Sequence, residues 1–202
     1  MIQLTHLRAA DYPRMPWKNG GGSTEEIARD TGDGLDGFGW RLSIADIAES
    51  GGFSSFAGYQ RVITVLQGAG MQLTIDGEDV RPLLPLDAFA FSGASQVDCT
   101  LLEGAIRDFN LIYCPQRYVA RLQWLDGQQR FFTQAHTLLL FSAAEQAWVD
   151  TGSAPVQALG RYDCLRLEGN RGLLEVALDG LCCVIELLSL IHISEPTRPE
   201  RI

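Results

Sequence analysis

The sequence predicts an all-β protein built from two similar barrel-like halves. Apolar residues alternate with a period of two along most of the chain, and turn signals such as Asp76-Gly77 recur at short intervals. The strand pattern of the first half also returns in the second. Short alternating segments bounded by turn residues are typical of sandwiches and barrels. Residues 87–104 carry no lasting apolar stripe at helical spacing, and helices are expected to be rare.

The first predicted strand is STEEIARD, residues 23–30. Its alternation places Thr24, Glu26 and Ala28 on one side and Ile27 on the other. The alternative is a helix opened by a capping box, because a Ser lies three residues before a Glu. The stretch TGDGLDG follows at once and would limit such a helix to about two turns. The all-β context therefore favours the strand.

Three glycines precede this strand in the stretch PWKNGGG. A phosphate-binding P-loop needs a buried strand before its glycines and a Lys after them. Here Lys18 comes before the glycines, and DYPRMPW is no buried strand. A dinucleotide fingerprint needs spaced glycines in a βαβ unit. We therefore expect an irregular turn in which Asn19 and the glycines, Gly20 first, take positive φ or allow close backbone approach.

The next strand is WRLSIADI, residues 40–47. Alternation puts Arg41 and Ser43 on one face and the apolar Trp, Leu and Ile on the other. RVITVLQGAGMQLTIDGE then reads as strand, turn and strand, with the Asp-Gly pair as a second hairpin signal. Further short strands are expected in DAFAFSG, VDCTLLEG and RDFNLIYC.

A repeat underlies these strands. VITVLQGAGMQLTIDGE leads to PLDAFAFSG, just as TLLLFSAAEQAWVDTGS leads to GRYDCLRLEG. In each unit an Asp, Asp87 or Asp163, comes before the last apolar strand. The alternative is chance similarity among all-β segments. The repeat predicts two related halves, residues 1–115 and 116–188, that pack as one unit because no Pro/Ser-rich linker separates them.

The C-terminal residues stand apart from this pattern. LSLIHISEPTRP, from Leu188 to Pro199, resembles the translation of a common sequencing-library adapter. Residues 189–202 are therefore interpreted as a non-native tail and set aside.

The composition disfavours some classes of function and indicates the compartment. The formal net charge of −9 over 202 residues disfavours nucleic acid as a partner, because an acidic surface repels phosphates. No run of about 18 apolar residues predicts a membrane span, and the N-terminus has no signal-peptide pattern. The five cysteines lack a C-x-x-C spacing and sit in apolar strings. Buried free thiols fit a reducing compartment, so a cytoplasmic location is expected.

The sequence resembles the HutD/Ves family. The matching stretches are PWKNGGGSTEEIA, WRLSIADIAESGGFSSFAGYQRVITVLQGAGMQL, LDAFAFSG and FNLIY, in the same order and spacing. The resemblance implies a cupin-like double-stranded β-helix barrel with two related halves, a bicupin, and an association with bacterial histidine utilisation. It favours small-ligand binding or regulation over catalysis.

Many cupins hold a metal through about three His and one carboxylate. Outside the tail this chain has only His6 and His136, so neither a metal nor another cofactor is expected. No G-x-S-x-G elbow appears, and no catalytic residue is assigned.

The remaining candidates form a polar cluster within the matching stretches. If one face of strand 40–47 points into the barrel, it carries a cation and a hydroxyl into an apolar cavity. Arginine offers a bidentate fork to a carboxylate. The alternative is that these arginines are solvated or paired at the surface, and that Phe53, Phe56 and Tyr59 mostly fill the core. The predicted ligand-binding residues are Lys18, Asn19, Gly20, Arg41, Ser43 and Arg61.

The leading hypothesis is a metal-free protein that binds a small acidic metabolite, with urocanate or formyl- or formimino-glutamate implied by the resemblance. A homo-oligomer is also considered. The second hypothesis is a metal-free enzyme of the same pathway, with Lys18, Glu25, Glu26 and Asp46 as proton-transfer groups. The third is an interaction scaffold whose barrel is packed solid.

Overall fold

The computed structural model describes residues 2–17, 20–31 and 37–190, and these fold into β-sheets throughout. Their helical element is a 3-10 turn, η1 (Ala9–Asp11). The all-β prediction is confirmed. No helix in the described ranges is long and apolar enough to cross a bilayer.

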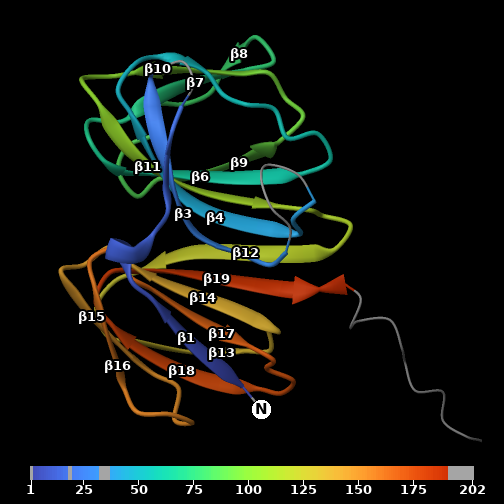
Figure 1. Ribbon diagram of the computed structural model, residues 1–202, viewed down its shortest axis with the longest axis vertical. Helices are drawn as coiled ribbons and strands as arrows, with labels where there is room; N and C mark the ends of the chain where they lie inside the picture. The colour runs from blue at the N-terminus through green and yellow to red at the C-terminus, as the bar shows by residue number, and fades with distance from the viewer. Residues whose placement is uncertain (1, 18–19, 32–36, 191–202) are drawn as a thin grey trace, which may run out of the picture.

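The first half consists of two sheets, seen in the upper part of Figure 1. Its inner sheet has the order β2 (Arg14–Pro16), β3 (Gly22–Arg29), β4 (Trp40–Ile47), β11 (Ile106–Tyr113), β6 (Gln60–Gln67), β9 (Ala88–Ser92). Its outer sheet has the order β5 (Gly51–Gly52), β10 (Val97–Leu101), β7 (Met71–Ile75), β8 (Glu78–Asp79).

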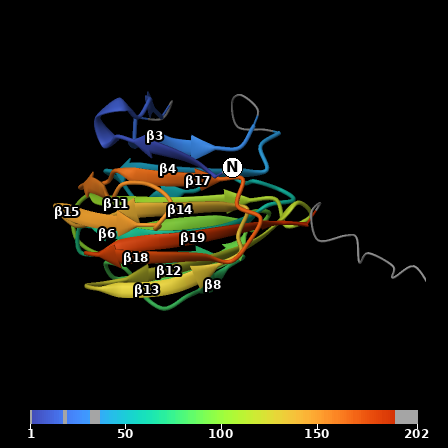
Figure 2. The ribbon, with the colours of Figure 1, turned by 90° about the horizontal axis from the view of Figure 1, so that it is seen from below.

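The second half, in the lower part of Figure 1, repeats this plan. Its inner sheet has the order β1 (Gln3–Leu7), β17 (Cys164–Glu168), β14 (Thr137–Ser142), β19 (Cys182–Ser189), β12 (Tyr118–Leu125). Its outer sheet has the order β13 (Gln129–Thr133), β18 (Leu174–Asp179), β15 (Gln146–Asp150), β16 (Gln157–Gly160). Viewed from below, most strands of both halves lie nearly along one axis and alternate in direction (Figure 2). The matching strand order is consistent with the predicted pair of related halves.

The two inner sheets pack face to face along a hydrophobic seam. Leu42 and Phe109 of the first half meet Leu139, Phe141 and Ile185 of the second, all of them buried. The rings of Phe109 and Phe141 lie 4.5 Å apart between centroids. Such an aromatic pair adds about 0.5–1.5 kcal/mol beyond its burial. The apolar face of strand 40–47 therefore faces the seam, which leaves its polar face for the barrel interior.

The interiors of the two halves differ. The space between the sheets of the second half is filled by aliphatic side chains such as Leu138, Leu140, Val176 and Val184. In the first half, buried residues such as Ile63 and Leu73 fill one end, and polar residues occupy the other. The hollow is therefore found in the first half.

Three details depart from the sequence interpretation. A β-bulge between Glu26 and Ala28 interrupts the alternation of β3, so Ile27 and Ala28 are both buried at the seam. The QGAG turn joins β6 to β7 but passes from the inner sheet to the outer one rather than closing a hairpin. The Asp76-Gly77 turn does close a hairpin, between β7 and β8.

The third departure concerns β1, which lies in the range assigned to the first half but pairs with β17 of the second. Leu4 packs against the second-half core. Burial of this apolar side chain stabilises the pairing of β1 with the second half. The carboxylate of Asp163 accepts hydrogen bonds from the backbone N–H groups of Ala9 and Gly160, at 2.9 and 3.0 Å. His6 Nε2 lies 3.0 Å from the same carboxylate.

The first two residues of the interpreted tail are part of the fold. β19 extends through Ser189, which pairs with Tyr118, and the N–H of Leu190 donates to the carbonyl of Arg117. Residues 191–202, the rest of the interpreted tail, lie outside the described residues.

Candidate functional site

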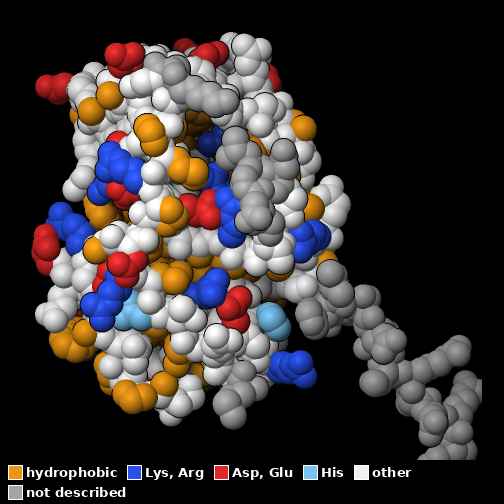
Figure 3. Space-filling view, viewed as in Figure 1, with side chains coloured by type: hydrophobic (Ala, Val, Ile, Leu, Met, Phe, Trp, Pro, Cys, Tyr) orange, Lys and Arg blue, Asp and Glu red, His pale blue; other side chains and the backbone are white. Residues whose placement is uncertain are grey.

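The candidate site is a pocket of about 620 Å³ between the two sheets of the first half. Figure 3 shows a hollow in the upper half of the molecule, with hydrophobic and basic side chains around it. Sixteen residues line the pocket: Met15, Pro16, Trp17, Thr24, Arg41, Ser43, Ala45, Ile47, Gly52, Phe53, Ser54, Phe56, Arg61, Asp108, Asn110 and Ile112.

Three adjacent strands supply the polar side chains of the pocket. Arg41 and Ser43 come from β4, Arg61 from β6, and Asp108 and Asn110 from β11. The register pairs Ser43 with Asn110, so these side chains lie on one face of the sheet. Alternate residues of a strand share a face, which explains why polar residues two apart all reach the same cavity.

Arg61 is buried, with only 6% of its surface exposed. Its Nη2 donates to Asn110 Oδ1 at 2.9 Å, and its Nη1 to the carbonyl of Ser54 at 3.2 Å. The guanidinium carbon also lies 5.0–5.5 Å from the ring centroids of Phe53, Phe56 and Phe91. The buried Nε has no hydrogen-bond partner among the described residues. Burial lowers the pKa of Arg61 to about 10, and the group stays cationic at neutral pH.

Asp108 is 1% exposed and accepts a hydrogen bond from Asn110 Nδ2 at 2.8 Å. Burial raises the pKa of its carboxyl group to about 7, against the opposing effects of Arg61, the Ala45 backbone and Asn110. A carboxyl group that titrates near neutrality inside a pocket is a feature of functional sites. Neither Asp108 nor Asn110 was among the predicted site residues.

Arg41 lies on the neighbouring strand and is paired. Its Nε donates to Glu26 Oε2 at 2.8 Å, and Arg29 forms a second ion pair with the same carboxylate. Burial alone would raise the pKa of Glu26, but its bonds from Arg29 and Arg41 outweigh burial and lower it. Glu26 therefore remains an anion that Arg41 and Arg29 share, and among the described residues that line the pocket Arg61 is the cation without a direct ion pair.

The glycine-rich turn borders the pocket through Trp17. The indole N–H of Trp17 donates to Thr24 Oγ1 at 2.8 Å, and its ring lies against Gly22, where a Cβ would come within 3.0 Å of it. Gly20 takes a φ of +76° in the turn and does not line the pocket. Lys18 and Asn19 lie outside the described residues. The glycines thus serve the hairpin and the close packing of Trp17.

The three aromatic residues considered as pocket walls occupy different positions in the structure. Phe53 and Phe56 line the pocket, whereas the hydroxyl of Tyr59 donates to the carbonyl of Phe38 at 2.9 Å. A core role was expected for at least two of the three, and the Tyr59 ring packs against the buried Phe38 with their centroids 4.7 Å apart. Phe53 also packs on the first-half core, so one ring serves both purposes.

Of the proton-transfer groups of the enzyme hypothesis, Glu25, Glu26 and Asp46 do not line the pocket, and Lys18 lies outside the described residues. Glu25 and Asp46 form ion pairs with Arg14 and Arg107 on the other face of the inner sheet. Across the described ranges, no group of three or more His, Cys, Asp or Glu side chains is arranged to hold a metal ion.

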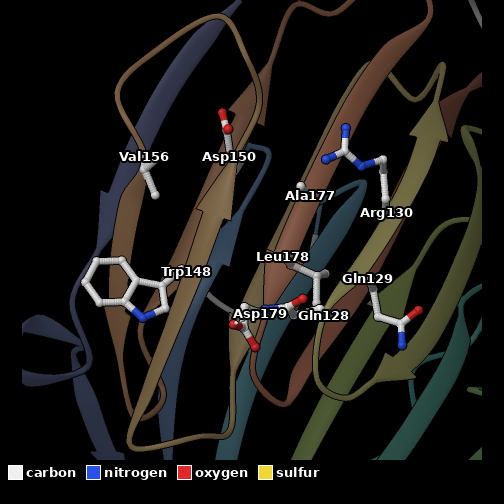
Figure 4. Close-up of a pocket in the computed structure, with 9 residues that line it drawn as sticks. All are labelled: Gln128, Gln129, Arg130, Trp148, Asp150, Val156, Ala177, Leu178 and Asp179. Carbon is white, nitrogen blue, oxygen red and sulfur yellow. Dashed lines mark hydrogen bonds between the residues drawn. The ribbon is translucent and has the colours of Figure 1, made fainter.

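A second concavity of about 380 Å³ lies on the outer face of the second half (Figure 4). It is a shallow groove between Trp148 and Val156 on one side and Arg130 on the other. Arg130 is paired with Glu175, and Asp150 and Asp179 add negative charge. This groove offers no unpaired cation to an acidic ligand, so the first-half pocket is the stronger candidate.

Comparison with known proteins places the fold and the pocket in context. A family model described as HutD matches residues 9–184, most of the chain. The chain belongs to the HutD family. An uncharacterised 21.2 kDa protein of the hutC 3′ region in Pseudomonas putida is 69% identical over 189 residues, covering 94% of this chain and 100% of that relative. Protein Ves of Escherichia fergusonii is 41% identical over 106 residues, covering 50% of this chain and 55% of Ves.

Solved structures support the same family and fold. HutD from Pseudomonas fluorescens SBW25 superposes with a TM-score of 0.86 at 65% identity, covering 93% of this chain and 99% of that HutD chain. A Cupin 2 conserved barrel domain protein from Leptotrichia buccalis gives a TM-score of 0.56 at 6% identity, covering 91% and 99% of the two chains. At that identity the match supports the fold alone. The cupin-like fold and the HutD/Ves resemblance are confirmed.

Proposed function

We propose that this HutD-family protein binds a small carboxylate metabolite in the first-half pocket and acts as an accessory or regulatory protein in histidine utilisation. The observation that carries the proposal is Arg61. Burying a guanidinium costs free energy unless its N–H groups find hydrogen-bond acceptors. The Nε of Arg61 has no acceptor among the described residues. A ligand carboxylate would meet that need and supply the missing counter-charge.

The rest of the pocket suits such a ligand. The Ser43 hydroxyl and the Asn110 amide offer hydrogen bonds beside Arg61, and Phe53, Phe56 and Trp17 offer apolar walls. Charge-assisted hydrogen bonds to a carboxylate are worth about 1.5–3 kcal/mol each. Arg41 is proposed as a secondary contact because Glu26 already holds it. Lys18 and Asn19 stay predicted contacts from the adjoining turn, whereas Gly20 does not line the pocket.

Histidine-breakdown acids are the proposed ligands. Urocanate and formyl- or formimino-glutamate all carry carboxylates, and all are small enough for a pocket of about 620 Å³. The flat body of urocanate matches the aromatic walls best.

A thermal-shift screen with these acids tests the proposal. A ligand that binds only the folded state at 100 times its Kd adds about 2.7 kcal/mol of stability. For a chain of this size that raises Tm by roughly 5–10 °C. Arg61→Met should reduce affinity about tenfold or more, whereas Arg81→Met, which removes an exposed cation of the same half, should bind as wild type does. No shift with any of the acids at millimolar concentration would refute the proposal.

The enzyme hypothesis is kept because of Asp108. Its buried carboxyl, with a pKa of about 7, is better suited to proton transfer than the groups expected from the sequence. Turnover of one of these acids by pure protein, lost in Asp108→Asn, would favour an enzyme over a binding protein.

Location and assembly are also proposed. All five cysteines are free thiols, four of them buried, as expected of a protein in the reducing cytoplasm. Nucleic acid is not expected as a partner of this acidic chain. Self-association stays a prediction that sedimentation velocity would test.

A further inference from the structure

The buried cation and the buried carboxyl group of the pocket are joined through one amide. Arg61 Nη2 donates to Asn110 Oδ1 at 2.9 Å, and Asn110 Nδ2 donates to Asp108 Oδ1 at 2.8 Å. The amide orientation is fixed at both ends, because its oxygen faces a cation and its nitrogen an acceptor. Arg61 and Asp108 form no direct ion pair, so Arg61 keeps donors free for a ligand.

The charges of the described residues then decide how an anion can be accommodated. Arg41 is held by Glu26, a carboxylate that it shares with Arg29, so Arg61 and Asp108 are the charged groups among the described pocket residues that are not already in an ion pair. If Asp108 is ionised, it cancels Arg61, and a ligand carboxylate adds an uncompensated negative charge to a buried site. If Asp108 is neutral, the ligand carboxylate cancels Arg61 instead. Uncompensated buried charge is strongly unfavourable, so the second arrangement wins.

We infer that the pocket binds its carboxylate ligand together with one proton, which is taken from solvent and held by Asp108. The neutral Asp108 carboxyl group donates its O–H to the ligand, while Arg61 donates N–H groups to the ligand carboxylate. This inference rests on the proposed function. It makes Asp108 a specificity-determining residue, since a neutral carboxyl favours ligands that present an acceptor oxygen there.

The surroundings of Asp108 support this assignment. The charged and titratable groups near Asp108 are Arg61 from β6 and Cys99 from β10 on the pocket side, and Asp46 from β4, whose charge acts from the other face of the sheet. Burial, followed by the charge of Asp108, raises the pKa of the Cys99 thiol to about 12. Arg61 also keeps its charge below pH 9. With a carboxyl pKa of about 7, Asp108 changes its charge within the range from pH 6 to 9.

Calorimetry in two buffers of different ionisation enthalpy measures the proton directly. The probes are cinnamate and N-formyl-L-glutamate, carboxylates that do not titrate between pH 6 and 9. For wild type we expect uptake of about half a proton at pH 7 and nearly one at pH 8. The Kd should then weaken about tenfold between pH 8 and pH 9.

Asp108→Asn provides the matched variant, because the amide is neutral at every pH and keeps the shape of the side chain. We expect it to bind without proton uptake and with the same Kd from pH 6 to 9. Asp98→Asn, which removes an exposed carboxylate of β10, should keep the wild-type profile.

The outcomes separate the two proposals. Binding of a probe to wild type with no proton uptake overturns this inference and leaves the proposed function intact. Failure of wild type to bind either probe, or any acid of the thermal-shift screen, overturns both. The two-buffer measurement on wild type decides the proton count even if Asp108→Asn fails to fold.

Discussion

Replacing Arg61 with Met should remove ligand binding while leaving the stability of the ligand-free protein nearly unchanged. The pKa of Arg61 falls from 12.5 to about 10 because burial disfavours the charged form. At about 1.36 kcal/mol per pKa unit, burial destabilises the charged side chain by about 3 kcal/mol. Both the folded and the unfolded pKa lie well above 7, so this destabilisation is the same from pH 6 to 8.

Methionine removes that destabilisation, but it also removes two hydrogen bonds. The acceptors on Asn110 and Ser54 lose their donors, at a cost of about 1–3 kcal/mol. The Met sulfur still packs against Phe53, Phe56 and Phe91. The opposing terms are of similar size, so the free energy of unfolding should stay within about 1.5 kcal/mol of wild type.

Urea unfolding followed by tryptophan fluorescence measures this difference without ligand. A loss of more than about 3 kcal/mol, the range for breaking a buried ion pair, would refute the reasoning. Arg61 would then be a structural residue that happens to line a cavity.

Three further predictions concern the frame around the pocket. Leu139→Ala at the seam should lower the free energy of unfolding in urea by about 2–5 kcal/mol. Val119 is half exposed, and Val119→Ala should change the same free energy by less than about 0.5 kcal/mol. Equal effects of the two substitutions would contradict the packing of the halves. Burial raises the pKa of Asp163, but bonds from backbone N–H groups and a histidine outweigh burial and hold the pKa below 3.8. Its stabilisation is therefore present above about pH 4 and lost as pH falls through the lower folded pKa, and acid unfolding of Asp163→Asn should show a weaker pH dependence. Gly22→Ala would set a Cβ 2.3 Å from a backbone carbonyl oxygen, and thermal melting should show a larger loss than for Gly20→Ala, whose cost is only its positive φ.

The sequence was sufficient for the residues whose position follows from alternation. Strand 40–47 has the predicted bounds, and its two-residue period placed Arg41 and Ser43 opposite the apolar seam face. Arg61 is the second residue of the next long strand and reaches the same cavity. These positions need only local geometry and knowledge of which face is apolar.

The missed features depend on contacts between distant strands. Asp108 and Asn110 alternate within the apolar strand RDFNLIYC, and that signal could have marked β11 as facing the pocket. The bulge in β3 and the pairing of β1 with β17 leave no mark in the local pattern. They are set by packing against residues more than a hundred positions away in the case of β1, which single-sequence periodicity does not contain.

The pairing of β1 with β17 of the second half also affects the order in which the protein can fold. Residues 3–7 leave the ribosome well before their partners, residues 164–168, are synthesised. β1 therefore stays unpaired while the intervening residues emerge, and its attachment joins an early and a late segment in one cooperative folding event.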